Sequence, residues 1–156
     1  MIRHGLIEAE PLDAPVIRGL IPGPLPQLTD AERDLYARIV TAGEIPSAPP
    51  ARVDVEVGDG DLVEFGGGAA VVGTPGHTDG SVAIYLPEHR LAFTGDSAAR
   101  TPDGRVVVGP FNTDRDRAID SLCCLAELDT DVACFGHGDP VMTGASGMLR
   151  TAADRP

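Results

Sequence analysis

The sequence predicts an α/β or α+β sandwich, in which a mixed sheet is flanked by helices. Three observations predict this fold class. Short apolar segments separated by turns follow one another from residue 52 onward, as β-strands do. An amphipathic helical pattern at 114–129 and a weaker one near 145–153 accompany them. The chain has 156 residues, of which 42% are hydrophobic, which is enough for one globular core.

Residues 1–51 differ from the rest of the chain in composition, because they contain eight of the 14 prolines. Between the proline clusters, residues 29–43 predict one helix, since Thr29 and Glu32 have the spacing of a capping box. We therefore expect a proline-rich connecting segment at 1–51 and a domain at 52–156.

The second part of the chain has the pattern of successive strands. The segments 69–73 and 81–86 are apolar on both sides, as in strands that are covered on both faces. The glycine run at 66–68 lies between two strands and has no helix after it, so it predicts a hairpin turn and not a nucleotide-binding loop. The expected strands are 52–57, 62–65, 69–73, 81–86, 91–95, 105–110 and 132–136.

The strongest helical pattern, at 114–129, has Thr113 as its expected N-cap residue. Its apolar residues recur at the spacing of one helix face: Ile119, Leu122, Cys123 and Ala126. The three cysteines lie in apolar segments, so we expect them to pack in the core: Cys123, Cys124 and Cys134.

Charge and composition exclude several classes of function. All 12 basic residues are arginines, and the absence of lysine excludes Schiff-base chemistry and a phosphate-loop lysine. The net charge of −12 disfavours nucleic acid and anionic membranes as partners. Three cysteines are too few for a disulfide framework, and no segment has the length of a membrane span. These features predict a cytoplasmic protein.

Three potential metal ligands each follow an apolar strand and a glycine. They are His77 in "TPGHTDGS", Asp96 in "LAFTGDS" and His137 in "FGHGDP". If the three strands share a sheet and a direction, these side chains meet at one edge, because the glycines let the backbone turn sharply. Imidazole and carboxylate groups suit Zn²⁺, and also Fe or Mn. The ligands are too far apart in sequence for a zinc finger and suit a catalytic site built from several strand ends.

Four polar neighbours are candidates for supporting these ligands. Asp79 and Asp139 flank the histidines and have the chemistry to orient an imidazole, with simple solvation in the loop as the alternative. Thr78 and Ser81 can hydrogen-bond the backbone of the loop that contains them.

Together and in this order, the three motifs resemble the C-terminal half of the metallo-β-lactamase fold hydrolases, over roughly residues 52–150. The resemblance implies an αββα sandwich. It also implies that His77 binds the first of two metals, that Asp96 bridges both, and that His137 binds the second. The implied cofactor is Zn²⁺, two ions in an intact site, with Fe or Mn as alternatives.

The chain departs from this family at the motif H-x-H-x-D-H, which precedes the TPGH motif in the family. Here His4 is the only histidine before His77. Each metal would keep two protein ligands, where a catalytic zinc usually has three. We therefore expect only the second half of the sandwich, as in a truncated gene product or a start codon assigned too late. Weak metal binding, an exposed apolar face and association through that face are expected consequences.

The leading hypothesis is a metal-dependent hydrolase of a small-molecule substrate. In such an enzyme a metal-bound hydroxide attacks an ester, thioester or amide carbonyl, and Asp96 acts as the catalytic residue that orients the water. One alternative is a non-catalytic remnant or a half-domain that depends on a partner chain. Another is a mononuclear iron site of the dioxygenase kind, built from His77, Asp96 and His137.

Overall fold

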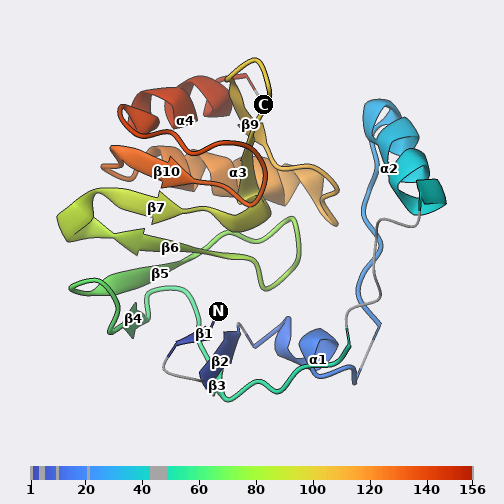
Figure 1. Cartoon of the computed structure of the whole chain (residues 1–156), viewed down its shortest axis with the longest axis horizontal. Coiled ribbons are helices and arrows are strands. Elements are labelled where there is room, and N and C mark those ends of the chain that lie inside the picture. Colours follow the sequence, from blue (N-terminus) through green and yellow to red (C-terminus); the bar gives the residue numbers. More distant parts are fainter. Residues whose placement is uncertain (1, 4–5, 10, 21, 43–48, 156) are drawn as a thin grey trace.

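A five-stranded mixed sheet lies at the centre of the computed structural model, which describes residues 2–3, 6–9, 11–20, 22–42 and 49–155. The strand order is β10-β7-β6-β5-β4 (Figure 1). Neighbouring strands are antiparallel, except that β10 is parallel to β7. The strands are β4 (Leu62–Val63), β5 (Ala69–Gly73), β6 (Val82–Leu86), β7 (Leu91–Phe93) and β10 (Val132–Cys134). This arrangement confirms the mixed α/β fold class that the sequence predicts.

The hairpin of β6 and β7 forms the middle of this sheet. Its register pairs Ile84 with Phe93. A 3-10 turn at Pro87–His89 makes the tip, and Arg90 closes it in a left-handed conformation with φ of 46°. Because successive side chains alternate between the two faces, Ala92 points toward the helices, whereas Ile84 and Phe93 point away from them.

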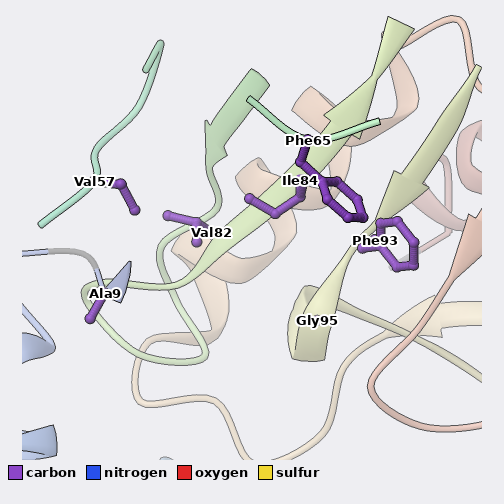
Figure 2. Close-up of a pocket in the computed structure, with 7 residues that line it drawn as sticks. All are labelled: Ala9, Val57, Phe65, Val82, Ile84, Phe93 and Gly95. Carbon is purple, nitrogen blue, oxygen red and sulfur yellow. The ribbon is translucent and has the colours of Figure 1, made fainter. Parts of the chain in front are cut away.

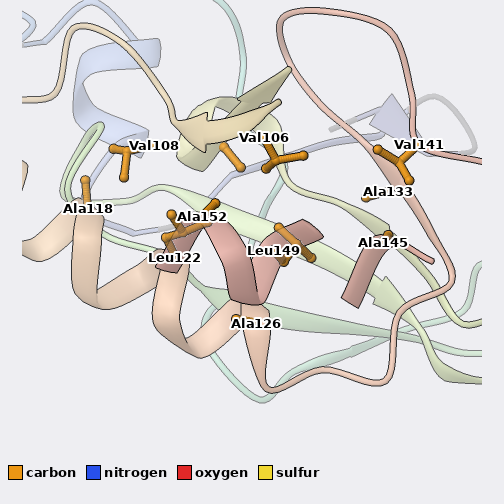
Figure 3. Packing of buried hydrophobic residues seen from close by; sticks show 11 residues of the cluster. Val106, Val108, Ala118, Leu122, Ala126, Ala133, Val141, Ala145, Leu149 and Ala152 are labelled. Carbon is orange, nitrogen blue, oxygen red and sulfur yellow. The ribbon is translucent and has the colours of Figure 1, made fainter. Parts of the chain in front are cut away.

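Helices α3 (Arg115–Ala126) and α4 (Ala145–Ala153) pack against each other over one face of the sheet (Figure 1). A small hairpin packs beside them and consists of β8 (Ala98–Arg100) and β9 (Val106–Val108). Figure 3 shows side chains from both helices and from β9 gathered in one core cluster. Leu122 and Leu149 lie almost fully buried in it. Within the described ranges, every helix is too short or too polar to cross a lipid bilayer.

Two details of α3 correct the sequence prediction. Asp114, not Thr113, is the N-cap residue, because its carboxylate accepts a hydrogen bond from the Arg117 backbone N–H at 3.1 Å. Cys123 and Cys124 are exposed and do not pack in the core. The buried face of α3 is offset from the expected one and carries Ala118, Ser121, Leu122, Leu125 and Ala126.

The helix predicted in the N-terminal segment is present as α2 (Asp30–Ala42). Its capping box is also present. The Thr29 N–H donates to the Glu32 carboxylate at 2.8 Å, and the Glu32 N–H donates to the Thr29 hydroxyl at 3.3 Å. The predicted last residue of this helix, Gly43, lies outside the described residues, as does His4.

The N-terminal segment contains more structure than one helix: β1 (Ile2–Arg3), β2 (Leu6–Ala9) and α1 (Ala14–Ile17). β2 pairs in parallel with β3 (Val55–Glu56), which is the only part of the expected strand at 52–57 that forms. Ala9, Ala14 and Val53 form a small hydrophobic cluster. A sheet and a cluster of side chains therefore join the segment 1–51 to the residues that follow it.

The face of the large sheet that points away from α3 and α4 is apolar and incompletely covered. Val82 and Ile84 are half-buried, and Phe93 is 39% exposed. A cavity of about 420 Å³ lies on this face (Figure 2) and is lined by Ala9, Val57, Phe65, Val82, Ile84, Phe93 and Gly95. The exposed apolar face that the sequence predicts is present only in part. Val57, Val63 and Val71 are buried in a cluster against which Val82 and Ile84 pack, and the exposed rings beside this cluster are those of Phe65 and Phe93.

Candidate functional site

The structure brings His77, Asp96 and His137 together at one edge of the large sheet. His77 Nε2 lies 3.7 Å from Asp96 Oδ2, and His137 Nε2 lies 3.4 Å from Asp96 Oδ1. The topology explains this meeting. β5 and β7 are both antiparallel to β6, and β10 is parallel to β7, so these three strands run in the same direction. The loops that follow them emerge at the same edge, and each loop supplies one of the three side chains.

Two glycines allow the backbone to approach this closely. A Cβ atom at Gly136 would lie 2.0 Å from Asp96 Oδ1. A Cβ atom at Gly76, where φ is +134°, would lie 2.3 Å from the backbone nitrogen of Ala118. Both positions therefore require glycine, one for contact between two site loops and one for packing of the His77 loop on α3.

A backbone carbonyl fixes the orientation of the His77 ring. His77 Nδ1 lies 3.1 Å from the carbonyl oxygen of Pro110. A carbonyl can only accept a hydrogen bond, so Nδ1 carries the proton and donates it. In the neutral ring, Nε2 then has a free lone pair, which faces Asp96. This is the arrangement in which a histidine serves as a metal ligand.

Asp96 has an unsatisfied oxygen at the centre of the site. Its Oδ1 atom is buried and has no hydrogen-bond partner among the described residues. A buried carboxylate oxygen is satisfied by a hydrogen-bond donor or by a cation, and a cation between Oδ1 and the imidazole would serve here. Two imidazoles and a carboxylate are the donor types that Zn²⁺ and Fe²⁺ accept. The residues therefore fit a metal by their chemistry.

The three side chains do not form a complete coordination shell. In the part of the chain that the structure describes, no group of three or more His, Cys, Asp and Glu side chains is arranged to hold a metal ion. The site is also open, because the side chain of His137 is 66% exposed and that of Asp96 is 36% exposed.

Ser81 bonds the backbone of the His77 loop, whereas neither Asp79 nor Asp139 orients an imidazole through any contact among the described residues. The Thr78 N–H donates to the Ser81 hydroxyl at 2.9 Å, which closes the His77 loop. Asp79 pairs with Arg117 at 2.6 Å. Asp139 is exposed. The group that contacts Nδ1 of the His77 ring is the Pro110 carbonyl instead.

Two residues of the N-terminal segment reach this site and were not predicted to do so. The Asp13 carboxylate accepts hydrogen bonds from the Thr78 hydroxyl at 2.5 Å and from the Gly80 N–H at 3.1 Å. Glu32 accepts a hydrogen bond from the Phe111 N–H at 3.0 Å. The capping box reveals Glu32 in the sequence but not this second contact, and no local pattern marks Asp13.

Comparison with known proteins assigns the chain to one family. The family model of the metallo-beta-lactamase superfamily matches residues 3–137. The match includes most of the N-terminal segment, which corrects the expected extent of 52–150. A protein named hydroxyacylglutathione hydrolase from Cereibacter sphaeroides is 41% identical over 91 residues, which are 57% of this chain and 33% of the relative. The chain thus spans about a third of the length of the first curated relatives that it matches.

Solved structures show the same fold. A metallo-beta-lactamase family protein from Thermus thermophilus has a TM-score of 0.59 and 21% identity, covering 96% of this chain and 50% of that chain. The protein TTHA1623, solved in a di-iron-bound form, has a TM-score of 0.59 and 27% identity, covering 94% of this chain and 63% of that chain.

Proposed function

This chain belongs to the metallo-β-lactamase superfamily, and from that premise we propose that its site serves a metal-dependent hydrolase of thioesters. The observation that carries the proposal is the meeting of His77, Asp96 and His137 around a buried carboxylate oxygen that has no hydrogen-bond partner among the described residues. The thioester class is supported by the relative named hydroxyacylglutathione hydrolase, since hydroxyacylglutathione is a thioester of glutathione.

We assign the metal ligands as His77 and His137, each through Nε2, and Asp96 through its carboxylate. Zn²⁺ is the proposed ion, and Fe is supported by the neighbour that was solved in a di-iron-bound form. When bound, such an ion acts as a Lewis acid toward water and toward a carbonyl oxygen.

The protein groups have separate roles in this proposal. The Pro110 carbonyl keeps the proton of His77 on Nδ1, so that Nε2 remains available as a ligand. Asp96 is the proposed catalytic residue: its carboxylate accepts a hydrogen bond from the attacking water and orients it toward the substrate carbonyl. The exposed side of His137 leaves room for a small thioester to enter.

The geometry favours two metal positions over one. Asp96 directs Oδ2 toward His77 and Oδ1 toward His137, so its two oxygens serve different imidazoles. A carboxylate that held one metal ion with each histidine would fit this division. A mononuclear iron site of the dioxygenase kind requires all three side chains to meet at one point, and it is therefore the weaker alternative.

A second candidate function is a half-domain that depends on a partner chain. The exposed apolar face around Phe93 favours it, because monomeric proteins rarely leave such a face open. In this alternative, further chain covers the face and completes the ligand set, and the isolated chain binds metal weakly.

Zinc titration by calorimetry tests the proposed ligands. Wild-type chain should bind Zn²⁺ weakly, and His77→Ala, Asp96→Ala and His137→Ala should each abolish the measurable heat. His89→Ala is the matched control, since His89 is exposed at the β6–β7 tip. Turnover of a glutathione thioester, with nitrocefin as a comparison, tests the substrate class. Unchanged zinc binding in the three variants would disprove the ligand assignment. Tight binding of two zinc ions by the wild-type chain would disprove the expectation that its ligand set is incomplete.

A further inference from the structure

The N-terminal segment holds the His77 loop from one side through Asp13. This residue precedes α1, and its neighbour Ala14 is fully buried in the small hydrophobic cluster, which fixes the backbone there. From this anchored position the two carboxylate oxygens of Asp13 bind different groups of one loop, the hydroxyl of Thr78 and the N–H of Gly80. Thr78 directly follows His77, so Asp13 restrains the backbone on the C-terminal side of His77.

The same segment holds the opposite side of the ring through Glu32. The Glu32 carboxylate accepts the Phe111 N–H at 3.0 Å, and Phe111 follows Pro110, whose carbonyl contacts His77 Nδ1. Phe111 adopts a left-handed conformation with φ of 61°, which a non-glycine residue keeps only where its surroundings enforce it. The ring of Tyr36 on α2 packs edge-to-face on Phe111, with 5.6 Å between the centroids.

A further contact ties the second loop to the segment that leads into α2. The Gln27 N–H donates to the Asn112 carbonyl at 2.6 Å. The two loops are also joined to each other, because the Thr113 N–H donates to the His77 carbonyl at 3.2 Å. The imidazole of His77 therefore extends from one loop and contacts a second loop, which contains Pro110 and Phe111. Each of these loops is bonded to a different part of the segment 1–51.

We propose that Asp13 and Glu32 are positioning residues, which together hold His77 with its proton on Nδ1 and its Nε2 directed at Asp96. This inference rests on the proposed function, because it assigns the segment a role in the proposed metal site. Asp13 fixes the loop that carries the imidazole, and Glu32 fixes the carbonyl that the imidazole binds. Among the contacts of the described residues, the two carboxylates bind Thr78, Gly80 and Phe111 and do not bind the proposed ligands themselves.

The first test reads the His77 ring directly by ¹⁵N NMR of the imidazole nitrogens in the metal-free chain. The chain has four histidines, and His77→Gln assigns the resonance. Wild type should show the Nδ1–H form, whereas Asp13→Ala and Glu32→Ala should shift the two nitrogens toward a mixture of both tautomers. A variant that is less stable but keeps the contact between His77 Nδ1 and the Pro110 carbonyl should keep the wild-type tautomer. The measurement therefore separates positioning from stability.

The second test is the zinc affinity of the same variants. Loss of a group that orients a ligand typically lowers metal affinity by about 10- to 100-fold, and we expect this range for both alanine variants. Asp13→Asn and Glu32→Gln keep an acceptor oxygen and should recover most of the affinity. Asp30→Ala is the matched control, because the fully exposed Asp30 side chain pairs only with Arg33 on its own helix among the contacts of the described residues.

The outcomes distinguish this inference from the proposed function. If the alanine variants keep the wild-type tautomer and an affinity within two-fold, the positioning role is wrong even though zinc binds. If the tautomer shifts as expected but no form of the chain binds zinc, the positioning role stands and the proposed metal site fails. Should Asp13→Ala not fold, Thr78→Val removes the same hydrogen bond from the other side and must shift the tautomer in the same direction.

Discussion

Asp96 lies in close contact with residues from two other loops of the site. Its carboxylate faces His77 and His137 from a 3-10 turn at Gly95–Ser97, and the backbone of Gly136 lies against Oδ1. Contact this close leaves no space for a side chain. Because Gly136 has no Cβ atom, Asp96 can lie close to His137.

Gly136→Ala should disrupt the site without unfolding the chain. The new Cβ would lie 2.0 Å from Asp96 Oδ1, so the carboxylate must move away from His137. We expect about 1–3 kcal/mol lower free energy of unfolding and at least a ten-fold loss of zinc affinity. Chemical denaturation and calorimetry measure the two effects.

Gly147→Ala is the control for this substitution. Gly147 lies in α4, and nothing occurs within 4 Å of an added Cβ. Alanine favours the helix over glycine by about 1 kcal/mol, so this variant should be as stable as wild type or slightly more stable, with unchanged zinc affinity. Equal behaviour of the two variants would show that the contact at Asp96 is unimportant.

Helix α2 illustrates how far local sequence patterns extend. The spacing of Thr29 and Glu32 identifies its capping box, because both partners of that contact lie within four residues. The contact from Glu32 to Phe111 spans 79 residues, and that from Asp13 to Thr78 spans 65. Such contacts depend on how the elements pack and leave no periodic signal in the sequence.

The site residues themselves could be found for a different reason. His77, Asp96 and His137 each follow a strand and a glycine, which is a local pattern, and the shared direction of β5, β7 and β10 brings them together. The buried face of α3 was harder to predict. Both Cys123 and Leu125 are apolar, so the pattern alone could not decide which of them faces the core.

Two neighbouring residues of α3 test which face carries the stability. Leu122 of α3 is fully buried in the core cluster with residues of α4 and β9. Leu122→Ala should therefore lower the free energy of unfolding by about 2–5 kcal/mol. Cys123 is exposed, and Cys123→Ala should change stability by less than about 0.5 kcal/mol. Denaturant unfolding of both variants checks this, and a large cost at Cys123 would contradict the face assigned here.

The N-terminus of α2 should make stability depend on pH. Burial opposes ionisation of Glu32, but hydrogen bonds from Thr29 and from the Phe111 N–H outweigh it and lower the pKa of Glu32 below its ordinary value. A carboxyl group whose pKa is lower in the folded chain stabilises the fold at pH values above its unfolded pKa. That stabilisation is lost as the pH falls through the folded pKa.

Comparison with Glu32→Gln isolates this contribution. At neutral pH wild type should be the more stable of the two, and the difference should shrink as the pH is lowered through the acidic range. Unfolding free energies at a series of pH values measure it. A difference that is independent of pH would mean that the charge of Glu32 is irrelevant to the fold.

Over the chain as a whole, two features act in opposite directions on association. The apolar face around Phe93 favours contact between copies, since burying it removes hydrocarbon surface from water. The net charge of −12 repels copies from one another. Charge repulsion at the surface weakens with salt, because the screening length falls from roughly 30 Å at 0.01 M to about 8 Å at 0.15 M, whereas the hydrophobic contribution does not weaken.

Association of the purified chain should therefore increase with both protein concentration and salt. Phe93→Gln removes the exposed aromatic ring of β7 and should shift sedimentation velocity profiles toward the monomer. Leu25→Gln is the control, because Leu25 is 84% exposed but does not line the apolar cavity. Association that weakens with salt would point to charge contacts instead. A chain that stays monomeric at every salt concentration would show that its apolar face needs no partner, and the half-domain alternative would then lose its main support.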